Sequence, residues 1–191
     1  MSGISWGCTD CIQASDTTWV ERQSVEAIFR ALNGDGARYL VVGGLAVVAH
    51  GYVRFTADID LILDLAPENL KRALGALQQL GYRPRAPVAL DEFADAGKRA
   101  EWVRDKGLTV FSLYSPNHPS TEIDLFVEAP LDFERAYAAA AAIDVAPAIA
   151  ATVIGLEDLL HLKRQAGRAQ DRMDIEKLQL LRDGGRDSEE P

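Results

Sequence analysis

Residues 50–63 read H-G-Y-V-R-F-T-A-D-I-D-L-I-L, an apolar run that carries two aspartates two positions apart. Side chains alternate across a β-strand, so this stretch divides into two faces. Arg54, Thr56, Asp58 and Asp60 fall on one face. The other face receives the apolar residues Phe55, Ala57, Ile59, Leu61 and Leu63. We therefore expect a strand with one core face and one face that carries either chemistry or solvent contacts.

A second expected strand, T-E-I-D-L-F-V at residues 121–127, repeats the pattern with Asp124 on its polar face. Three aspartates on neighbouring strands can direct their carboxylates into one small volume. Three like charges there repel one another and raise their own pKa values unless a positive charge lies among them. Carboxylate oxygens are hard ligands that suit Mg²⁺ or Mn²⁺. We therefore expect Asp58, Asp60 and Asp124 to bind one of these ions.

A glycine pair, Gly43-Gly44, separates a short apolar strand at residues 39–42 from a short helix at 45–50. A bare glycine backbone can approach a phosphate closely, and the start of a helix is slightly positive. A lone G-G or D-x-D more often marks a turn or a solvated face. Their order and spacing, together with Asp124, instead predict a site where two ions ~4 Å apart hold a nucleoside triphosphate and stabilise its pyrophosphate leaving group.

The chain of 191 residues is 48% hydrophobic and carries a net charge of −9. That charge argues against a protein that wraps long nucleic acid, because basic residues supply most of that affinity. One RNA end needs only a local basic patch. The residues that we expect to form such a patch are Arg83, Arg85, Lys98, Arg99, Arg104 and Lys106.

The apolar runs are interrupted and fall short of the ~20 residues that a membrane-spanning helix needs. The first residues lack a basic start followed by an apolar run, so we expect no secretory signal and no membrane contact, and a cytoplasmic protein. The only C-x-x-C pair, Cys8 and Cys11, is interpreted as incidental, since a structural zinc normally has four ligands.

The apolar periodicities predict an α/β (α+β) fold: a small mixed β-sheet with flanking helices over one face and a C-terminal helical piece. Expected helices cover residues 20–32, 45–50, 66–80, 91–106, 156–165 and 169–181, and expected strands include 39–42, 83–88, 108–114 and 121–127. The alanine-rich segment 136–152 is expected to mix helix with a short edge strand at 143–145. The expected organisation is a flexible N-terminus at 1–17, a core at 18–130, a helical region closing the cleft at 131–182 and a disordered tail at 183–191.

The sequence G43-G-L-A-V-V-A-H-G-Y-V-R-F-T-A-D-I-D-L61 resembles the signature of the polymerase-β-like nucleotidyltransferase superfamily, a GG or GS turn followed by D-x-D. The arginine and threonine before the aspartates are similar to those of AbiEii/MenT-like toxin nucleotidyltransferases. The resemblance implies a minimal nucleotidyltransferase fold. It also implies these roles: metal binding by Asp58 and Asp60, a third catalytic carboxylate at Asp124, and triphosphate binding by Gly43 and Gly44.

The resemblance extends to residues 156–175, L-E-D-L-L-H-L-K-R-Q-A-G-R-A-Q-D-R-M-D-I, which match a lysine-bearing helix followed by an aspartate-bearing helix. By this comparison Lys163 contacts nucleotide phosphates, and Arg168 contributes to the same nucleotide site. Asp171 and Asp174, three residues apart on one helical face, orient the lysine or line the pocket. Gln170 stands where family members often carry a lysine, so one phosphate or acceptor contact differs here.

Two side chains before the D-x-D pair have alternative roles. Arg54 either reaches a phosphate or forms an ion pair with Asp58 or Asp60, because these charges share a face. Thr56 is expected to support the aspartates by hydrogen bonding. His50 is interpreted as a cap or a packed side chain rather than as a catalytic base.

The leading hypothesis is an enzyme: a Mg²⁺-dependent nucleotidyltransferase that moves a nucleoside monophosphate from a nucleoside triphosphate to an acceptor hydroxyl. Asp124 would help to deprotonate that hydroxyl. The toxin branch implies a tRNA end or a partner protein as acceptor, and a cognate antitoxin. Similarity to aminoglycoside and lincosamide nucleotidyltransferases leaves a small drug as the alternative acceptor. A non-catalytic nucleotide-binding antitoxin or regulatory module, and a structural domain with coincidental motifs, are the alternatives to an enzyme.

Overall fold

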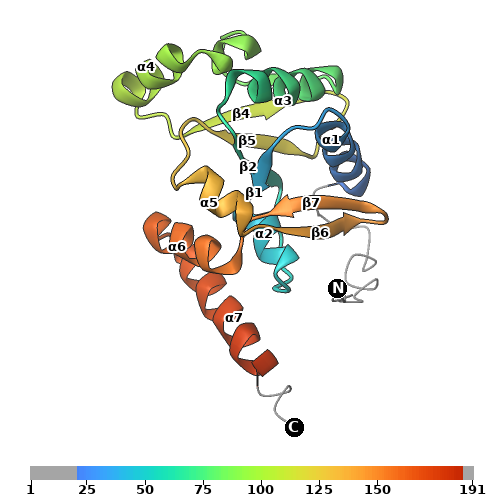
Figure 1. Cartoon of the computed structure of the whole chain (residues 1–191), viewed down its shortest axis with the longest axis vertical. Coiled ribbons are helices and arrows are strands. Elements are labelled where there is room, and N and C mark those ends of the chain that lie inside the picture. The colour runs from blue at the N-terminus through green and yellow to red at the C-terminus, as the bar shows by residue number, and fades with distance from the viewer. Residues whose placement is uncertain (1–20, 187–191) are drawn as a thin grey trace.

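The computed structural model describes residues 21–186, which form one seven-stranded mixed sheet with flanking helices (Figure 1). The α/β fold expected from the sequence is therefore confirmed. The strand order is β3-β4-β5-β2-β1-β7-β6. The strands are β1 (Tyr39–Val41), β2 (Asp58–Leu63), β3 (Arg83–Pro84), β4 (Val110–Tyr114), β5 (Glu122–Phe126), β6 (Ala141–Ala146) and β7 (Ile149–Val153). The expected flexible N-terminus, its two cysteines and residues 187–191 of the expected tail lie outside the described residues.

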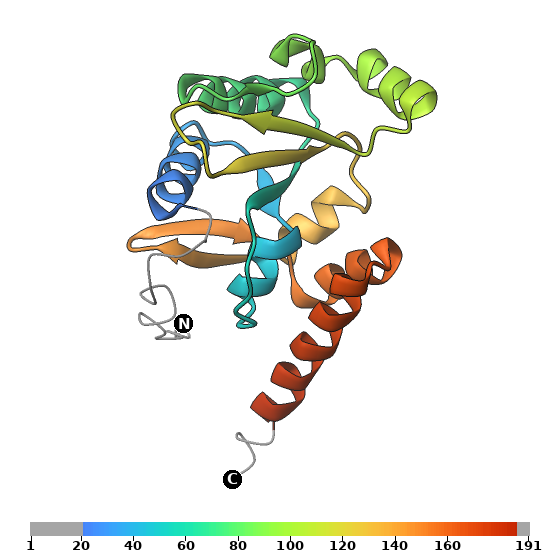
Figure 2. The same ribbon diagram turned by 180° about the vertical axis from the view of Figure 1, so that it is seen from behind.

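The helices lie around the sheet, and α4 and α7 occupy opposite ends of the molecule (Figures 1 and 2). They are α1 (Arg22–Gly34), α2 (Gly43–Ala49), α3 (Pro67–Gln79), a 3₁₀ turn η1 (Leu90–Ala94), α4 (Ala96–Lys106), α5 (Phe133–Ala138), α6 (Leu156–Ala166) and α7 (Ala169–Arg186). Among residues 21–186, no helix combines the length and the apolar character needed to cross a bilayer.

The core forms where the apolar stripes of α1 and α3 meet the sheet. Every third or fourth residue of α1 is buried, and so is the matching stripe of α3. Helix α1 packs on α3, β6 and β7, and α3 also packs on β2. Burying each such Leu, Ile or Phe side chain contributes about 1.5–3 kcal/mol, so this face holds the sheet in place. The buried stripes comprise Val25, Ile28, Phe29 and Leu32 in α1, and Leu70, Ala73, Leu74 and Leu77 in α3.

The central strands bring the aspartates together through their register. Strand β2 runs parallel to β5, with Asp60 opposite Asp124. Strand β1 pairs antiparallel with the other edge of β2. The alternate residues Ile59 and Leu61 are fully buried, which fixes the register because a one-residue slip would expose them. All the carboxylates on the opposite face of these two strands therefore point the same way.

The strand that was expected to carry Phe55 and Ala57 on its core face begins only at Asp58. Phe55 is 55% exposed and Ala57 is also exposed, so the prediction that they belong to the core is wrong. Residues 52–57 have no sheet partner, and Arg54 in this segment pairs with Asp174 of α7.

The alanine-rich segment mixes helix with strand, and the edge strand expected at 143–145 lies within β6, but a second strand was not expected. It contains α5 and a β6–β7 hairpin closed by a two-residue loop at residues 147–148. Strand β7 pairs in parallel with β1, Val41 opposite Val153, so the sheet extends past the boundary expected at residue 130. Alanine has little strand preference of its own, and pairing with β1 decides the local structure. The C-terminal helices begin only at residue 156.

Three other elements differ in length from the prediction. The helix expected over residues 91–106 is divided into η1 and α4, because Asp95 accepts a hydrogen bond from the Lys98 backbone N–H and starts a new helix there. Strand β3 is two residues long instead of six. Helix α7 continues to Arg186, four residues into the segment that was expected to be a disordered tail.

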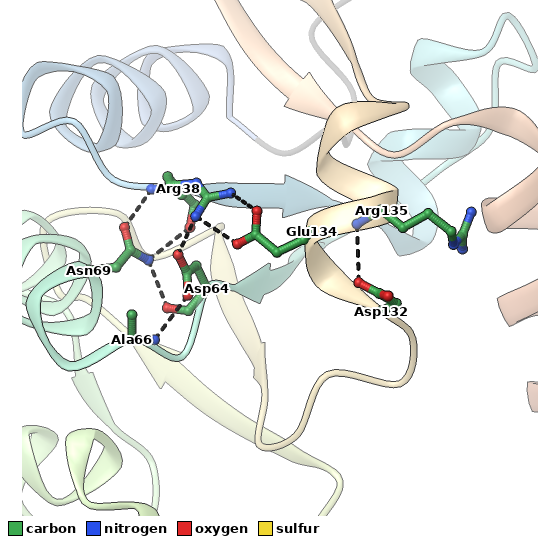
Figure 3. A network of polar contacts seen from close by, with 7 residues as sticks. All are labelled: Arg38, Asp64, Ala66, Asn69, Asp132, Glu134 and Arg135. Carbon is green, nitrogen blue, oxygen red and sulfur yellow. Dashed lines mark hydrogen bonds and ion pairs between the residues drawn. The ribbon is translucent and has the colours of Figure 1, made fainter.

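Helix α5 is fastened to the first two strands by Arg38 (Figure 3). The guanidinium lies 2.7 Å from a carboxylate oxygen of Asp64, after β2, and 2.7 Å from one of Glu134 in α5. The Asn69 side chain accepts from the Arg38 backbone N–H and donates to its carbonyl. The guanidinium also lies over the ring of Tyr137. This network joins β1, β2 and α5 at the end of β2 that is remote from the aspartates.

Candidate metal and phosphate site

Three carboxylates meet where β2 and β5 lie side by side. Carboxylate oxygens of Asp58, Asp60 and Asp124, one from each residue, all lie within 4.8 Å of one another, and each residue is half-buried. The two strands are parallel and in register, so no loop needs to move to assemble the group. The donor set consists of carboxylates alone, which suits a hard divalent cation.

Crowding and burial make this group unfavourable as three free anions. Burial, together with the charges of Asp58 and Asp124, raises the pKa of Asp60 to about 6. Burial also raises the pKa of Asp124, although a hydrogen bond from Ser112 opposes the change. A divalent cation would relieve the same repulsion without protonation.

The glycine turn lies directly against the cluster. Gly43 has φ +60°, and a Cβ there would lie 1.7 Å from Asp60 Oδ2, so no side chain fits. A Cβ on Gly44 would lie 2.3 Å from the Thr56 hydroxyl oxygen. That hydroxyl donates to Asp58 Oδ1 at 3.0 Å, which confirms that Thr56 supports an aspartate by hydrogen bonding. The backbone of the turn therefore borders the carboxylates without a side chain between them.

A buried ionic group from α6 and α7 lies beside the cluster. Lys163 Nζ is 3.1 Å from Asp171 Oδ1 and 2.7 Å from Asp174 Oδ2, and all three side chains are at most 7% exposed. The positive charge of Lys163 counteracts the rise in the pKa of Asp60, which places the lysine within electrostatic reach of the triad. The expected contact of the lysine with both aspartates is thus present, and its contact with phosphate stays a prediction.

Arg54 does not pair with Asp58 or Asp60, so that alternative is wrong. Its Nε lies 2.9 Å from Asp174 Oδ1, and its Nη1 donates to the Phe55 carbonyl at 2.7 Å. The arginine therefore pairs with α7 instead of with the aspartates that follow it in the chain. Its other terminal nitrogen, Nη2, lies next to Gly44.

Arg168 has a different position from Lys163. Its side chain is 79% exposed, and both its Nε and its backbone N–H donate to Asp171 Oδ2. These hydrogen bonds join Arg168 to the first turn of α7. Gln170 donates to Asp174 Oδ1 at 3.0 Å, so the glutamine supports the aspartate from the position where members of the resembled family often carry a lysine.

One contributor escaped the sequence reasoning. Ser112 on β4 lies opposite Asp124 in the antiparallel β4–β5 pair, and its hydroxyl acts to lower the pKa of that carboxyl. The alternation in F-S-L at residues 111–113 already places this serine on a polar face between two apolar neighbours. That signal was available before the structure.

The expected basic patch is not a cluster of free cations. Arg99 is buried and donates to the Phe93 carbonyl at 2.6 Å, so it cannot contribute. Most of the other members pair with acidic side chains. These pairs are Arg85 with Glu122, Lys98 with Glu92 and Glu101, and Arg104 with Asp105. The positive charge available to a long nucleic acid at this face is therefore small.

His50 is a packed side chain, as expected. Its Nε2 lies 2.8 Å from the Ile154 carbonyl oxygen, and burial lowers the pKa of the imidazole. It joins the end of α2 to the chain that follows β7.

Comparison with known proteins identifies no relative, so the evidence on function comes from the site itself. No protein-family model matches the chain, and no curated protein matches it.

Proposed function

We propose that this protein is a metal-dependent nucleotidyltransferase that resembles the polymerase-β-like superfamily and its AbiEii/MenT-like toxin branch. It would transfer a nucleoside monophosphate from a nucleoside triphosphate to an acceptor hydroxyl and release pyrophosphate. The observation that carries the proposal is the convergence of Asp58, Asp60 and Asp124 within 4.8 Å, on adjacent parallel strands and against a glycine turn.

The residues fit Mg²⁺ or Mn²⁺ as the metal. The donor atoms are carboxylate oxygens, and the raised pKa of Asp60 reflects a crowded negative group that a cation would stabilise. Asp58, Asp60 and Asp124 would hold the ions. When bound, the metal would lower the pKa of the attacking hydroxyl and offset charge on the triphosphate.

The chain itself would supply positioning and proton transfer. The acceptor oxygen forms a bond to the α-phosphorus while the bond from that phosphorus to the pyrophosphate oxygen breaks. Asp124 would take the hydroxyl proton, and Ser112, which lies opposite it on β4, would orient the carboxylate. Lys163 would offset negative charge on the phosphates, and the turn at Gly43 and Gly44 leaves room for them.

The acceptor proposed from the toxin branch is a tRNA end or a partner protein, with a cognate antitoxin as a further partner. A small molecule, as in aminoglycoside or lincosamide modification, is the second candidate. An RNA end needs basic side chains that can contact its phosphates, and few in the expected patch are unpaired. This observation favours the small molecule as acceptor.

The test is label transfer from each α-labelled nucleoside triphosphate, with Mg²⁺ or Mn²⁺, into the RNA, protein and small-molecule fractions of a bacterial lysate. We expect label in one fraction, reduced roughly 100-fold or more by Asp60→Asn. Asp144→Asn on the exposed edge strand β6 serves as the matched control and should transfer normally.

The outcomes separate the alternatives. Nucleotide binding without label in any fraction would replace the enzyme with a nucleotide-binding antitoxin or regulatory module. Absence of nucleotide binding would leave the motifs as coincidental features of a structural domain.

A further inference from the structure

The Arg54 guanidinium makes one ion pair and one hydrogen bond. Its Nε lies 2.9 Å from Asp174 Oδ1, and its Nη1 donates to the Phe55 carbonyl at 2.7 Å. Its Nη2 lies 3.0 Å from the position that a Cβ on Gly44 would take, and within residues 21–186 it donates to no protein group. The side chain is only 17% exposed. One nitrogen of a fixed guanidinium is thus directed at the glycine turn.

The glycine turn leads from this nitrogen to the carboxylates. A Cβ on Gly43, the neighbour of Gly44 in the turn, would lie 1.7 Å from Asp60 Oδ2. Arg54 Nη2 is therefore adjacent to a turn that borders a proposed metal ligand. A planar guanidinium with a free N–H at such a place is suited to a phosphate oxygen, which accepts a charge-assisted hydrogen bond.

Asp174 determines where the guanidinium lies. The carboxylate is fully buried. Its Oδ1 accepts a hydrogen bond from the Gln170 amide and lies 2.9 Å from Arg54 Nε, while its Oδ2 lies 2.7 Å from Lys163 Nζ. Burial works against the charged form of Asp174, but the hydrogen bonds from Lys163 and Gln170 and the nearby cations lower its pKa overall, so it stays ionised. One anion in α7 thus holds two cations that come from separate parts of the chain.

We propose that Arg54 binds the triphosphate and that Asp174 is its positioning residue, so that α7 sets the geometry of the phosphate site. This inference rests on the proposed function. A lysine in place of Arg54 keeps the charge but has a single donor nitrogen, which cannot contact Asp174 and the phosphate in the same fixed plane.

The test measures binding instead of turnover, with inorganic triphosphate in saturating Mn²⁺ as the probe and calorimetry as the method. We expect Arg54→Lys and Asp174→Asn each to weaken triphosphate binding about tenfold or more, since a charge-assisted hydrogen bond is lost. Binding of Mn²⁺ alone should stay unchanged in Arg54→Lys. Arg182→Ala is the matched control, because that arginine also lies in α7 and pairs with Glu157 of α6, and its triphosphate affinity should stay unchanged.

The ratio of triphosphate affinity to Mn²⁺ affinity separates a role of Asp174 in positioning Arg54 from a general effect of the ion pair on stability. Equal loss of both in Arg54→Lys and Asp174→Asn would overturn the proposal in favour of a structural ion pair. Normal triphosphate binding by both variants would overturn it while the proposed function stands. A wild-type protein that binds Mn²⁺ but neither inorganic triphosphate nor any nucleoside triphosphate would overturn both.

Discussion

The contact between a glycine and an aspartate is the tightest feature of the site at the scale of single residues. Gly43 has φ +60°, where an L-residue is strained, and its missing Cβ is the space that Asp60 Oδ2 occupies. The Asp60 carboxylate can therefore take this position only if residue 43 is a glycine. Sequence alone showed the glycine but not which side chain lies against it.

Gly43→Ala should lower the free energy of unfolding by about 2 kcal/mol or more, because backbone strain adds to the displacement of Asp60. It should also abolish Mn²⁺ binding. Urea unfolding and Mn²⁺ calorimetry measure the two effects.

Gly75→Ala is the matched control. Gly75 lies within α3, and a Cβ there would meet no atom within 4 Å. Alanine should stabilise that helix by about 0.5–1 kcal/mol and leave Mn²⁺ binding unchanged. Normal Mn²⁺ binding by Gly43→Ala would show that the turn does not shape the site.

The tie between α5 and the strands through Arg38 belongs to the scale of elements. Arg38→Ala removes ion pairs to Asp64 and Glu134 and a stacked contact on Tyr137. A single exposed ion pair is worth about 0–1 kcal/mol, but here one guanidinium serves two elements. We expect a loss of about 1–2 kcal/mol in urea unfolding.

Arg135→Ala on the same helix removes a single ion pair, the one with Asp158. The Arg135 side chain is 57% exposed. The substitution should lower the free energy of unfolding less than Arg38→Ala does. A larger loss for Arg135→Ala than for Arg38→Ala would contradict the role given to the network.

The elements that sequence predicted correctly are those whose information is local. The stripe of α1 and the alternation of β2 and β5 recur within a few residues, so Ile59, Leu61 and Asp124 could be assigned to faces directly. The edge strand expected at 143–145 is present within β6, but its partner β7 was missed because β7 depends on pairing with β1, more than 100 residues earlier in the chain. The contact of Arg54 with Asp174 escaped for the same reason, since no local pattern connects them.

The resemblance located residues that local patterns could not connect. Periodicity alone would leave Lys163 on a solvated helix face, yet the structure buries it between Asp171 and Asp174. Comparison of motifs carries information on tertiary contacts that a single-sequence periodicity lacks. It did not extend to the ion-pair partner of Arg54 or to the supporting residue Ser112.

At the scale of the whole molecule, the aspartate cluster destabilises the folded state when no cation is present. The pKa of Asp60 is about 6 in the folded chain, against 3.8 for the ordinary group. The folded state therefore binds more protons than the unfolded state between these values, and stability falls as the pH rises through that interval. The difference corresponds to about 3 kcal/mol for this group. Asp124, whose pKa is also raised, acts in the same direction.

A bound divalent cation should reverse this dependence. We expect the melting temperature of the metal-free protein, measured in chelator, to decrease between pH 5 and pH 7 relative to that of Asp60→Asn, which has no titrating group at residue 60. Taking the difference between the two proteins cancels the other titrating groups. With Mn²⁺, the wild type should gain stability over the same interval, because the ion competes with protons for the carboxylates. Asp60→Asn should show little of this gain. Parallel pH profiles for the two proteins, with and without Mn²⁺, would mean that the triad neither stores this repulsion nor binds the ion, and the metal site would then have to be sought elsewhere.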